Sequence, residues 1–379
     1  MRVEQCRWTA SGGWGAQAPG GLGATAQLAL VFGGTAVVQD QALVRTVTAA
    51  YPQAQIVGCS TAGEIFGTQV ADDSLTVTAV AFEHARVRAA SAAISEGRES
   101  RQVGERLGAA LEPQGLVHVI VFSDGQRVNG SELVRGIAGR LPAGVAVTGG
   151  LAGDGTRFQH TLVWADGAPA EGRVVVLGLY GAHLRVGYGS LGGWDPFGPE
   201  RLITRSEGNV LYELDEQPAL ALYKQYLGEH AAGLPAAGLL FPLSVRSARG
   251  GGDVVRTILS VDEAGQSLTF AGDVPTGDFA RLMKANFDRL VDGAHGAAQR
   301  SHAALDAGAA ELALLISCVG RKLVLQQRTE EELEAVREVL GPQAALTGFY
   351  SYGEICPAAP NTDCQLHNQT MTITTLAEA

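Results

Sequence analysis

One short phrase occurs three times in the chain, and it constrains the fold more than any other feature. Each copy begins with proline, runs through a short apolar stretch and ends in a glycine followed by a carboxylate. The copies are Pro52–Glu64, Pro142–Asp154 and Pro342–Glu354, and they align without a gap. Internal repetition of this kind indicates a protein assembled from related structural units.

The sequence that precedes each copy repeats as well. Apolar runs that end in glycine are typical of buried strands, and they occur at Leu28–Gly34, Leu116–Gly125 and Leu312–Gly320. Segments with helical periodicity follow at Ala42–Ala50, Ser131–Arg140 and Thr329–Leu340. Thr329 and Glu332 have the spacing of a capping box. Each unit therefore reads as strand, helix, strand and Gly-acid turn, and the units must stack to bury their apolar faces.

The length of 379 residues suits two domains. The turn-rich stretch Gly192–Pro199 contains three glycines and two prolines, so we place a boundary there, between 1–194 and 195–379. The first 24 residues are predicted to be irregular, and Asp278–Val291 is predicted to be a helix. The sequence thus predicts an α/β protein of two related domains, built from repeated strand-helix-strand units with mixed sheets.

Composition limits the functional classes. The net charge is −11 and no cluster of Lys and Arg is present, so we expect no nucleic-acid partner. No apolar run approaches the roughly 18 residues that span a bilayer, and the start of the chain lacks the pattern of a signal peptide. The five cysteines are odd in number and widely spaced, which favours a reducing compartment. These features predict a cytoplasmic protein without a membrane partner and leave its oligomeric state open.

With these pieces in order, the sequence resembles the FIST family of sensory proteins, in which FIST N and FIST C domains occur in tandem. The resemblance rests on Gly58–Ile65, Gly149–Gly155, Leu214–Gly228, Gly272–Met283, Gly348–Pro357 and His367–Thr374. It implies a FIST N-like domain over 1–194 and a FIST C-like domain over 195–379. It also implies a sensor of a small ligand inside the cell, without enzymatic activity, that signals to a separate histidine kinase or cyclic-di-nucleotide enzyme.

The stretch Gly187–Pro199 and the ending of the chain are similar to a branch of this family that senses nitric oxide through haem. That resemblance implies a haem cofactor with an axial imidazole. His183, after the strand Val174–Tyr180, and His367, beside the third acid turn, are the alternative candidates for the iron ligand. For each histidine, the other interpretation is a structural side chain with its hydrogen bonds satisfied.

The Gly-acid turns predict a site for an amino-acid-type ligand without haem. A strand end with glycine admits a ligand close to the backbone, and a carboxylate receives an ammonium group. The candidate residues are the acids and nearby polar groups Ser60, Thr61, Glu64, Asp154, Tyr350, Tyr352, Glu354 and Asn368. The alternative is that the repeat geometry requires these turns, with the carboxylates bonding local backbone amides.

The rival hypothesis from another class is a cysteine-dependent enzyme. Cys59 and Cys318 lie at strand ends, where an exposed thiolate would be a nucleophile, although a buried thiol is the commoner state. The sequence contains no G-x-S-x-G, P-loop or H-E-x-x-H motif. Two arginines beside apolar strands, Arg256 and Arg321, are of the type that clamps a carboxylate or a haem propionate, with a structural salt bridge as the alternative.

Overall fold

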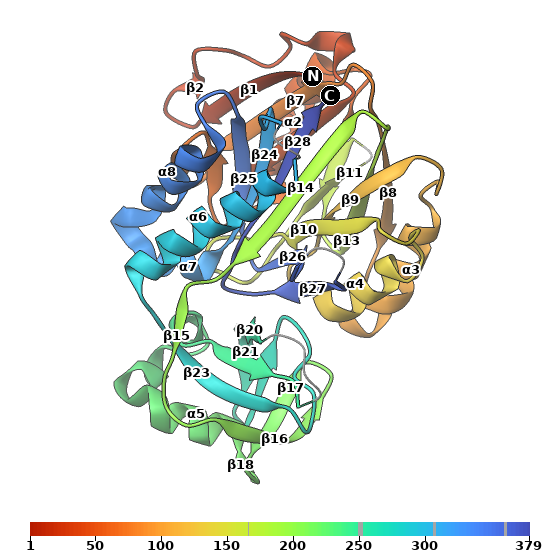
Figure 1. Ribbon diagram of the computed structural model, residues 1–379. Coiled ribbons are helices and arrows are strands. Elements are labelled where there is room, and N and C mark those ends of the chain that lie inside the picture. The colour runs from red at the N-terminus through yellow and green to blue at the C-terminus, as the bar shows by residue number, and fades with distance from the viewer. Residues whose placement is uncertain (166, 249–252, 306–307, 360–361) are drawn as a thin grey trace.

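The computed structural model describes the chain except for residues 166, 249–252, 306–307 and 360–361. The described residues form four sheets, three of which build one large body while the fourth forms a smaller domain beside it (Figure 1). Helices cover the outside of the large body. The predicted α/β class with mixed sheets is therefore confirmed.

Each sheet of the large body contains four corresponding strands in the same order, because each repeat folds in the same way. The first strand of a unit is central, and the second pairs with it in parallel. The third pairs with the first in antiparallel orientation, and the fourth pairs with the third in the same way. In the first sheet these are β3 (Leu28–Gly33), β4 (Gln55–Ser60), β7 (Leu75–Ala81) and β1 (Arg2–Thr9). In the second they are β9 (Leu116–Ser123), β10 (Ala146–Leu151), β13 (Arg173–Tyr180) and β8 (Arg86–Ala93). In the third they are β24 (Leu312–Cys318), β25 (Ala345–Ser351), β28 (Met371–Glu378) and β14 (Leu184–Leu191).

The strand after each Gly-acid turn crosses into the sheet of another unit. β5 (Glu64–Phe66) pairs with β25, β26 (Gly353–Pro357) pairs with β10, and β11 (Val163–Ala165) pairs with β4. The exchange is cyclic, so it ties the three units together. β6 (Gln69–Ala71), β12 (Ala168–Ala170), β27 (Cys364–His367) and β2 (Gly13–Trp14) extend the edges.

Backbone hydrogen bonds join the three turns at the centre of the body. Ala62 donates to the carbonyl of Tyr350 over 2.8 Å, and Gly153 donates to the carbonyl of Ser60 over 2.9 Å. A third bond runs from the Tyr352 amide to the carbonyl of Leu151 over 3.2 Å. The repeated turns are therefore in contact in space, although they are far apart in the sequence.

The core lies between the inner faces of the three sheets. Phe32, Phe122 and Phe349 each come from a different sheet, and their ring centroids lie 4.8–6.1 Å apart. Burial of such apolar side chains is the main term that holds the units together. The outer faces are covered by α2 (Gln41–Ala50), α3 (Ser100–Ala109), α4 (Gly130–Ala138), α6 (Phe287–Ala303) and α8 (Thr329–Leu340), while α1 (Thr35–Val38) and α7 (Val319–Leu325) are short.

The smaller domain is an insertion that has its own core. It runs from β15 (Trp194–Pro196) to β23 (Phe279–Ala285) and packs α5 (Ala219–Leu227) on a nine-stranded sheet. Its other strands are β16 (Arg201–Glu207), β17 (Val210–Leu214), β18 (Gln217–Pro218), β19 (Leu243–Arg246), β20 (Val254–Arg256), β21 (Ile258–Asp262) and β22 (Ser267–Phe270). The chain leaves the large body near the expected joint, but it returns at α6. Residues of 195–379 from α6 onward therefore complete the large body rather than a second domain.

Three local predictions need correction. The first 24 residues are not irregular throughout, because β1 pairs with β7 from Arg2 to Trp8. Asp278–Val291 is not one helix: β23 pairs with β15 and β19, and Asn286 then caps α6. The capping box is absent from α8, because Glu332 is buried and accepts hydrogen bonds from Ser317, Arg321 and Tyr350 instead. Tertiary contacts override the local pattern in each case.

Candidate functional site

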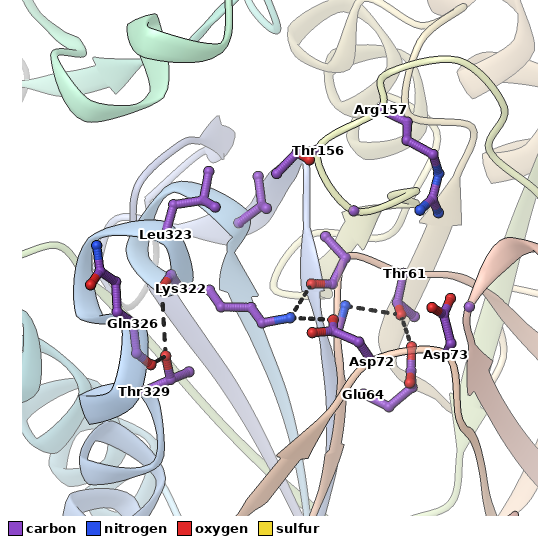
Figure 2. A pocket seen from close by; sticks show the side chains of 15 residues that line it. Thr61, Glu64, Asp72, Asp73, Thr156, Arg157, Lys322, Leu323, Gln326 and Thr329 are labelled. Carbon is purple, nitrogen blue, oxygen red and sulfur yellow. Dashed lines mark hydrogen bonds and ion pairs between the residues drawn. The ribbon is translucent and has the colours of Figure 1, made fainter. Parts of the chain in front are cut away.

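A cavity of about 540 Å³ lies where the three repeat units meet (Figure 2). The first unit contributes the turn after β4 and the loop before β7, the second contributes the loop after β10, and the third contributes α7 with the residues after it. The lining residues are Gly34, Thr61, Ala62, Gly63, Glu64, Asp72, Asp73, Gly155, Thr156, Arg157, Val319, Lys322, Leu323, Gln326 and Thr329. A ligand in this cavity would touch all three units.

Glu64 is the buried acid of the cavity, with only 1% of its surface exposed. The hydroxyl of Thr61 donates to one carboxyl oxygen, and the other accepts from the Ser74 amide and hydroxyl over 2.9 and 2.7 Å. Burial raises the pKa of Glu64 to about 7, although these hydrogen bonds act in the opposite direction. Near neutral pH the carboxyl group is therefore poised between its neutral and charged forms.

Lys322 brings a positive charge to the same cavity from α7. Its Nζ donates to the carbonyl of Ala62 over 2.9 Å and also to Asp72, an exposed acid on the first unit (Figure 2). Glycine at residue 63 suits both the backbone of the turn and this nearby ammonium. Gly63 has φ +142°, and a Cβ there would lie 2.6 Å from Lys322 Nζ.

Arg157 supplies a second cation from the second unit. Its side chain is exposed and extends from the loop after β10 toward the side of the cavity formed by Thr61 and Asp73 (Figure 2). Within the described part of the chain, no hydrogen bond or ion pair engages its guanidinium group. The lining of the cavity therefore carries two cations, Arg157 and Lys322, and three acids, Glu64, Asp72 and Asp73. It thus offers partners for both charges of a small zwitterion.

Of the eight predicted ligand-binding residues, Thr61 and Glu64 line this cavity. Sequence reasoning missed Asp72, Lys322 and Arg157. Arg157 follows the second Gly-acid turn by three residues, and this position was a usable signal. Nothing local marks Lys322, because only the strand exchange brings α7 against the first unit.

The other predicted polar residues are buried and have hydrogen-bond partners. The Ser60 hydroxyl donates to the Gly153 carbonyl and accepts from the Leu162 amide, both over 2.8 Å. Asn368 donates to the Tyr352 carbonyl and accepts from the Thr257 amide. These contacts hold the turns in place, and neither side chain lines the cavity.

The second acid turn matches the structural alternative. Asp154 accepts from the backbone amides of Phe158, Gln159 and His160 over 2.8–2.9 Å and from the hydroxyl of Tyr352. An acid with four donors has its acceptor sites occupied. The role of Asp154 in the structure is thus to shape the loop that carries Arg157.

The third acid turn reproduces the geometry of the first. Glu354 accepts from the Ser351 hydroxyl over 2.5 Å and from the amide and hydroxyl of Thr370 over 3.1 and 3.0 Å. Burial raises the pKa of Glu354 to about 8. Tyr350, also fully buried, donates to Glu332 over 2.6 Å. Neither Glu354 nor Tyr350 lines the cavity.

Neither of the two candidate haem ligands lines the cavity at the three turns. His183 is exposed, and its Nδ1 lies 2.9 Å from the carbonyl oxygen of Ala379. His367 is buried, its Nε2 lies 2.9 Å from the Cys356 carbonyl oxygen, and burial lowers its pKa to about 4. An axial ligand needs one free nitrogen beside an open apolar wall. The surroundings of the two histidines do not fit that requirement. Among the described residues there is also no cluster of three or more His, Cys, Asp or Glu that would hold a metal ion.

The two candidate nucleophiles are likewise inaccessible. Cys59 has 1% of its surface exposed and Cys318 has none. Burial raises the pKa of both thiols far above their usual range. Each thiol therefore stays protonated at neutral pH, and neither faces a described cavity.

The cavity has the volume and the charged lining that suit a small polar ligand, on a repeat-built α/β scaffold. Residues 27–217 match the FIST N domain and residues 219–357 match the FIST C domain. The chain therefore belongs to the FIST family, whose domains are small-ligand sensor domains in signalling proteins. No helix in the described part of the chain has the length and apolar character needed to cross a membrane.

Comparisons with individual proteins add little. The chain is 24% identical over 269 residues to an uncharacterized protein of Methanocaldococcus jannaschii, which covers 63% of this chain and 50% of the relative. It thus spans about half the length of that protein. Two solved structures, a cyanuric acid hydrolase and the cyanuric acid hydrolase of A. caulinodans, align over 78% of this chain and over 69% and 99% of theirs. Their TM-scores are 0.23 and 0.18 at 9% and 12% identity, so these alignments support no conclusion.

Proposed function

We propose that the chain senses a small zwitterion, an amino acid or a close analogue, in the cavity between the three repeat units. One observation carries the proposal. A cavity of about 540 Å³ is lined by three acids of the first unit, by one cation of the second unit and by one cation of the third. Ligand cavities of about 300–1,000 Å³ are typical for small molecules. The predicted amino-acid-type sensor without haem is the form of the sensor hypothesis that this geometry supports best.

The two ends of the ligand would have different partners. Arg157 is free to take the carboxylate, because no described residue engages its guanidinium, and a planar fork suits a carboxylate. The buried acid Glu64 and the exposed acid Asp72 both line the cavity, and they would receive the ammonium group. Lys322 already donates to Asp72, so a ligand ammonium would compete with it for that carboxylate.

Ligand binding would act on the contacts between units. Lys322 belongs to the third unit, and its two hydrogen bonds reach Ala62 and Asp72 of the first. A ligand that replaces one of these bonds changes the relative stability of two arrangements of the units, which is how a binding site controls a distant surface. The partner that responds to that change would be a separate histidine kinase or cyclic-di-nucleotide enzyme.

A thermal-shift screen of the common amino acids tests the proposal. We expect at least one to raise the melting temperature in a saturable way, and Arg157→Gln to weaken that response by about tenfold or more. Arg45→Gln is the matched control, because Arg45 is an exposed arginine on α2 and lines none of the described cavities. A screen without any saturable response, or an equal loss in both variants, contradicts the proposal.

Haem-based nitric-oxide sensing is the finer form of the sensor hypothesis, and no contact of His183 or His367 favours it. A hemin titration with His183→Ala and His367→Ala decides it. A sharp Soret band that one substitution removes would establish a haem site. A broad, unsaturable absorbance in all three proteins would end the haem interpretation and leave the zwitterion sensor standing.

A further inference from the structure

A second cavity, of about 640 Å³, separates the large body from the smaller domain. The large body contributes α4 and β27, and the smaller domain contributes β19, β20 and the loop after β22, which face each other in Figure 1. Its lining includes the arginines Arg101, Arg135 and Arg256, and an apolar wall formed by Val245, Val254, Pro275 and Leu366. None of its lining residues belongs to the first cavity.

Arg256 is the unusual side chain of this cavity. The residue has only 5% of its surface exposed, yet no carboxylate pairs with it among the described residues. Its Nε donates to the Asp273 carbonyl over 2.9 Å, and its Nη1 donates to the carbonyls of Leu366 and Val255 over 2.8 and 3.4 Å. These three acceptors are neutral. Both N–H groups of Nη2 remain without a hydrogen bond in the described part of the chain.

Burial without an opposite charge is costly for a cation. It lowers the pKa of Arg256 to about 10, which still leaves the group charged at neutral pH. Arg321, the other arginine that is buried among the described residues, meets this cost by pairing with Glu332 over 2.8 Å. Arg256 has no such partner among the described residues. It lines the cavity, and its Nη2 has no hydrogen bond there to a described residue.

The surroundings select one kind of anion. The nearest acid, Asp273, is occupied, since it accepts from Arg135 and from Asn129 over 2.8 Å each. Asp278 and Asp363 also line the cavity, and no described cation pairs with either. Their negative charge disfavours a phosphate dianion. The apolar wall favours a ligand with a hydrophobic body, so a single carboxylate on an apolar skeleton fits both conditions.

We propose that this cavity is a second ligand site, in which Arg256 binds the carboxylate of a small apolar organic acid between the large body and the smaller domain. The site does not depend on the zwitterion cavity. A ligand here would add a bridge between Arg256 of the insertion and α4 of the body. It would therefore strengthen the hold of the smaller domain on the repeat units.

Benzoate and hexanoate are suitable probes, with inorganic phosphate as the anion control. Isothermal titration calorimetry on the full chain is expected to show saturable binding of at least one carboxylate and none of phosphate. Arg256→Gln is expected to weaken the binding by about tenfold to a hundredfold. Arg157→Gln, in the first cavity, is expected to leave it unchanged.

A second variant keeps the test valid if Arg256→Gln disturbs the domain interface. Ala138 is an exposed residue of α4 that lines the cavity, so Ala138→Trp fills the space without removing a buried contact. Ala109→Trp on α3 is the matched control, because Ala109 is exposed and lines no described cavity. Binding lost in Ala138→Trp and kept in Ala109→Trp supports the site. No saturable carboxylate binding, binding unaffected by Ala138→Trp, or phosphate binding as tight as benzoate would overturn it.

Discussion

Glutamine at position 64 is expected to make the protein more stable than the wild type above neutral pH. The raised pKa of Glu64 means that the folded protein keeps a proton on this carboxyl group that the unfolded chain has already released. The unfolded chain therefore binds fewer protons than the folded protein between pH 4.5 and about 7. Over this window the contribution of Glu64 to stability falls as the pH rises, and it stays constant above the window.

The magnitude follows from the two pKa values. The difference between the ordinary value of 4.5 and about 7 corresponds to about 3 kcal/mol in the free energy of unfolding, at about 1.4 kcal/mol for each pH unit. Glutamine has the same shape and does not ionise. Its carbonyl oxygen would replace the Glu64 oxygen that accepts from Ser74, and its amide would donate to the Thr61 hydroxyl, which in the wild type donates to Glu64.

Urea unfolding of both proteins at a series of pH values from 4.5 to 8.5 measures this effect. We expect the variant to gain about 3 kcal/mol on the wild type between the two ends of the series. Burial lowers the pKa values of His118 and His367 to about 3 and about 4, so stability from these residues rises with pH up to about 6.5. That rise is common to both proteins and cancels in the difference. Parallel curves would refute the burial argument.

Other substitutions test the fixed parts of the scaffold. Gly63→Ala is expected to destabilise the fold by about 1–3 kcal/mol in chemical denaturation, because side chains rarely adopt the backbone conformation of Gly63. It is also expected to weaken ligand binding, because the added Cβ would displace Lys322. An unchanged denaturant midpoint would contradict the backbone strain assigned to this position. Arg321→Met leaves Glu332 buried without its charged partner and is expected to cost about 3–5 kcal/mol in urea unfolding. The double variant Arg321→Met/Glu332→Gln removes the unpaired charge and keeps an amide oxygen for the hydroxyls of Ser317 and Tyr350, so it is expected to recover part of that loss; a double variant as unstable as the single one would contradict the cost assigned to the unpaired charge. The thiol of Cys318 is expected to react with Ellman's reagent no faster than the protein unfolds; rapid reaction in native buffer would restore the cysteine-enzyme hypothesis.

The repeat was the most informative part of the sequence. Pro52–Glu64 and its two copies predicted the strand, helix, strand and acid-turn unit, and α2, α4 and α8 lie within a residue or two of the predicted segments. The pattern did not reveal the cyclic exchange of β5, β11 and β26. A strand of three to five residues pairs equally well with any sheet edge of suitable register, so only the assembled units decide its partner.

The site was predictable to the extent that it uses the repeat. Glu64 was found because it closes the first copy, but the repeat pattern marks Asp154 and Glu354 equally, and the fold engages these two acids with partners away from the cavity. Arg157 and Lys322 reach the cavity through the exchange of strands between units, so no local spacing connects them to Glu64. The strand β23 was misread as a helix because its apolar residues fit either period over so short a stretch.

The proposed function requires both charged groups of a small zwitterion to bind in one cavity. The most direct test is calorimetric titration of wild-type protein and Arg157→Gln with an amino acid found in the screen and with the amine that lacks its carboxylate. We expect the wild type to bind the amino acid at least about tenfold more tightly than the amine. We also expect Arg157→Gln to remove most of this difference. Equal affinities in the wild type, or an undiminished difference in the variant, would contradict the proposed function.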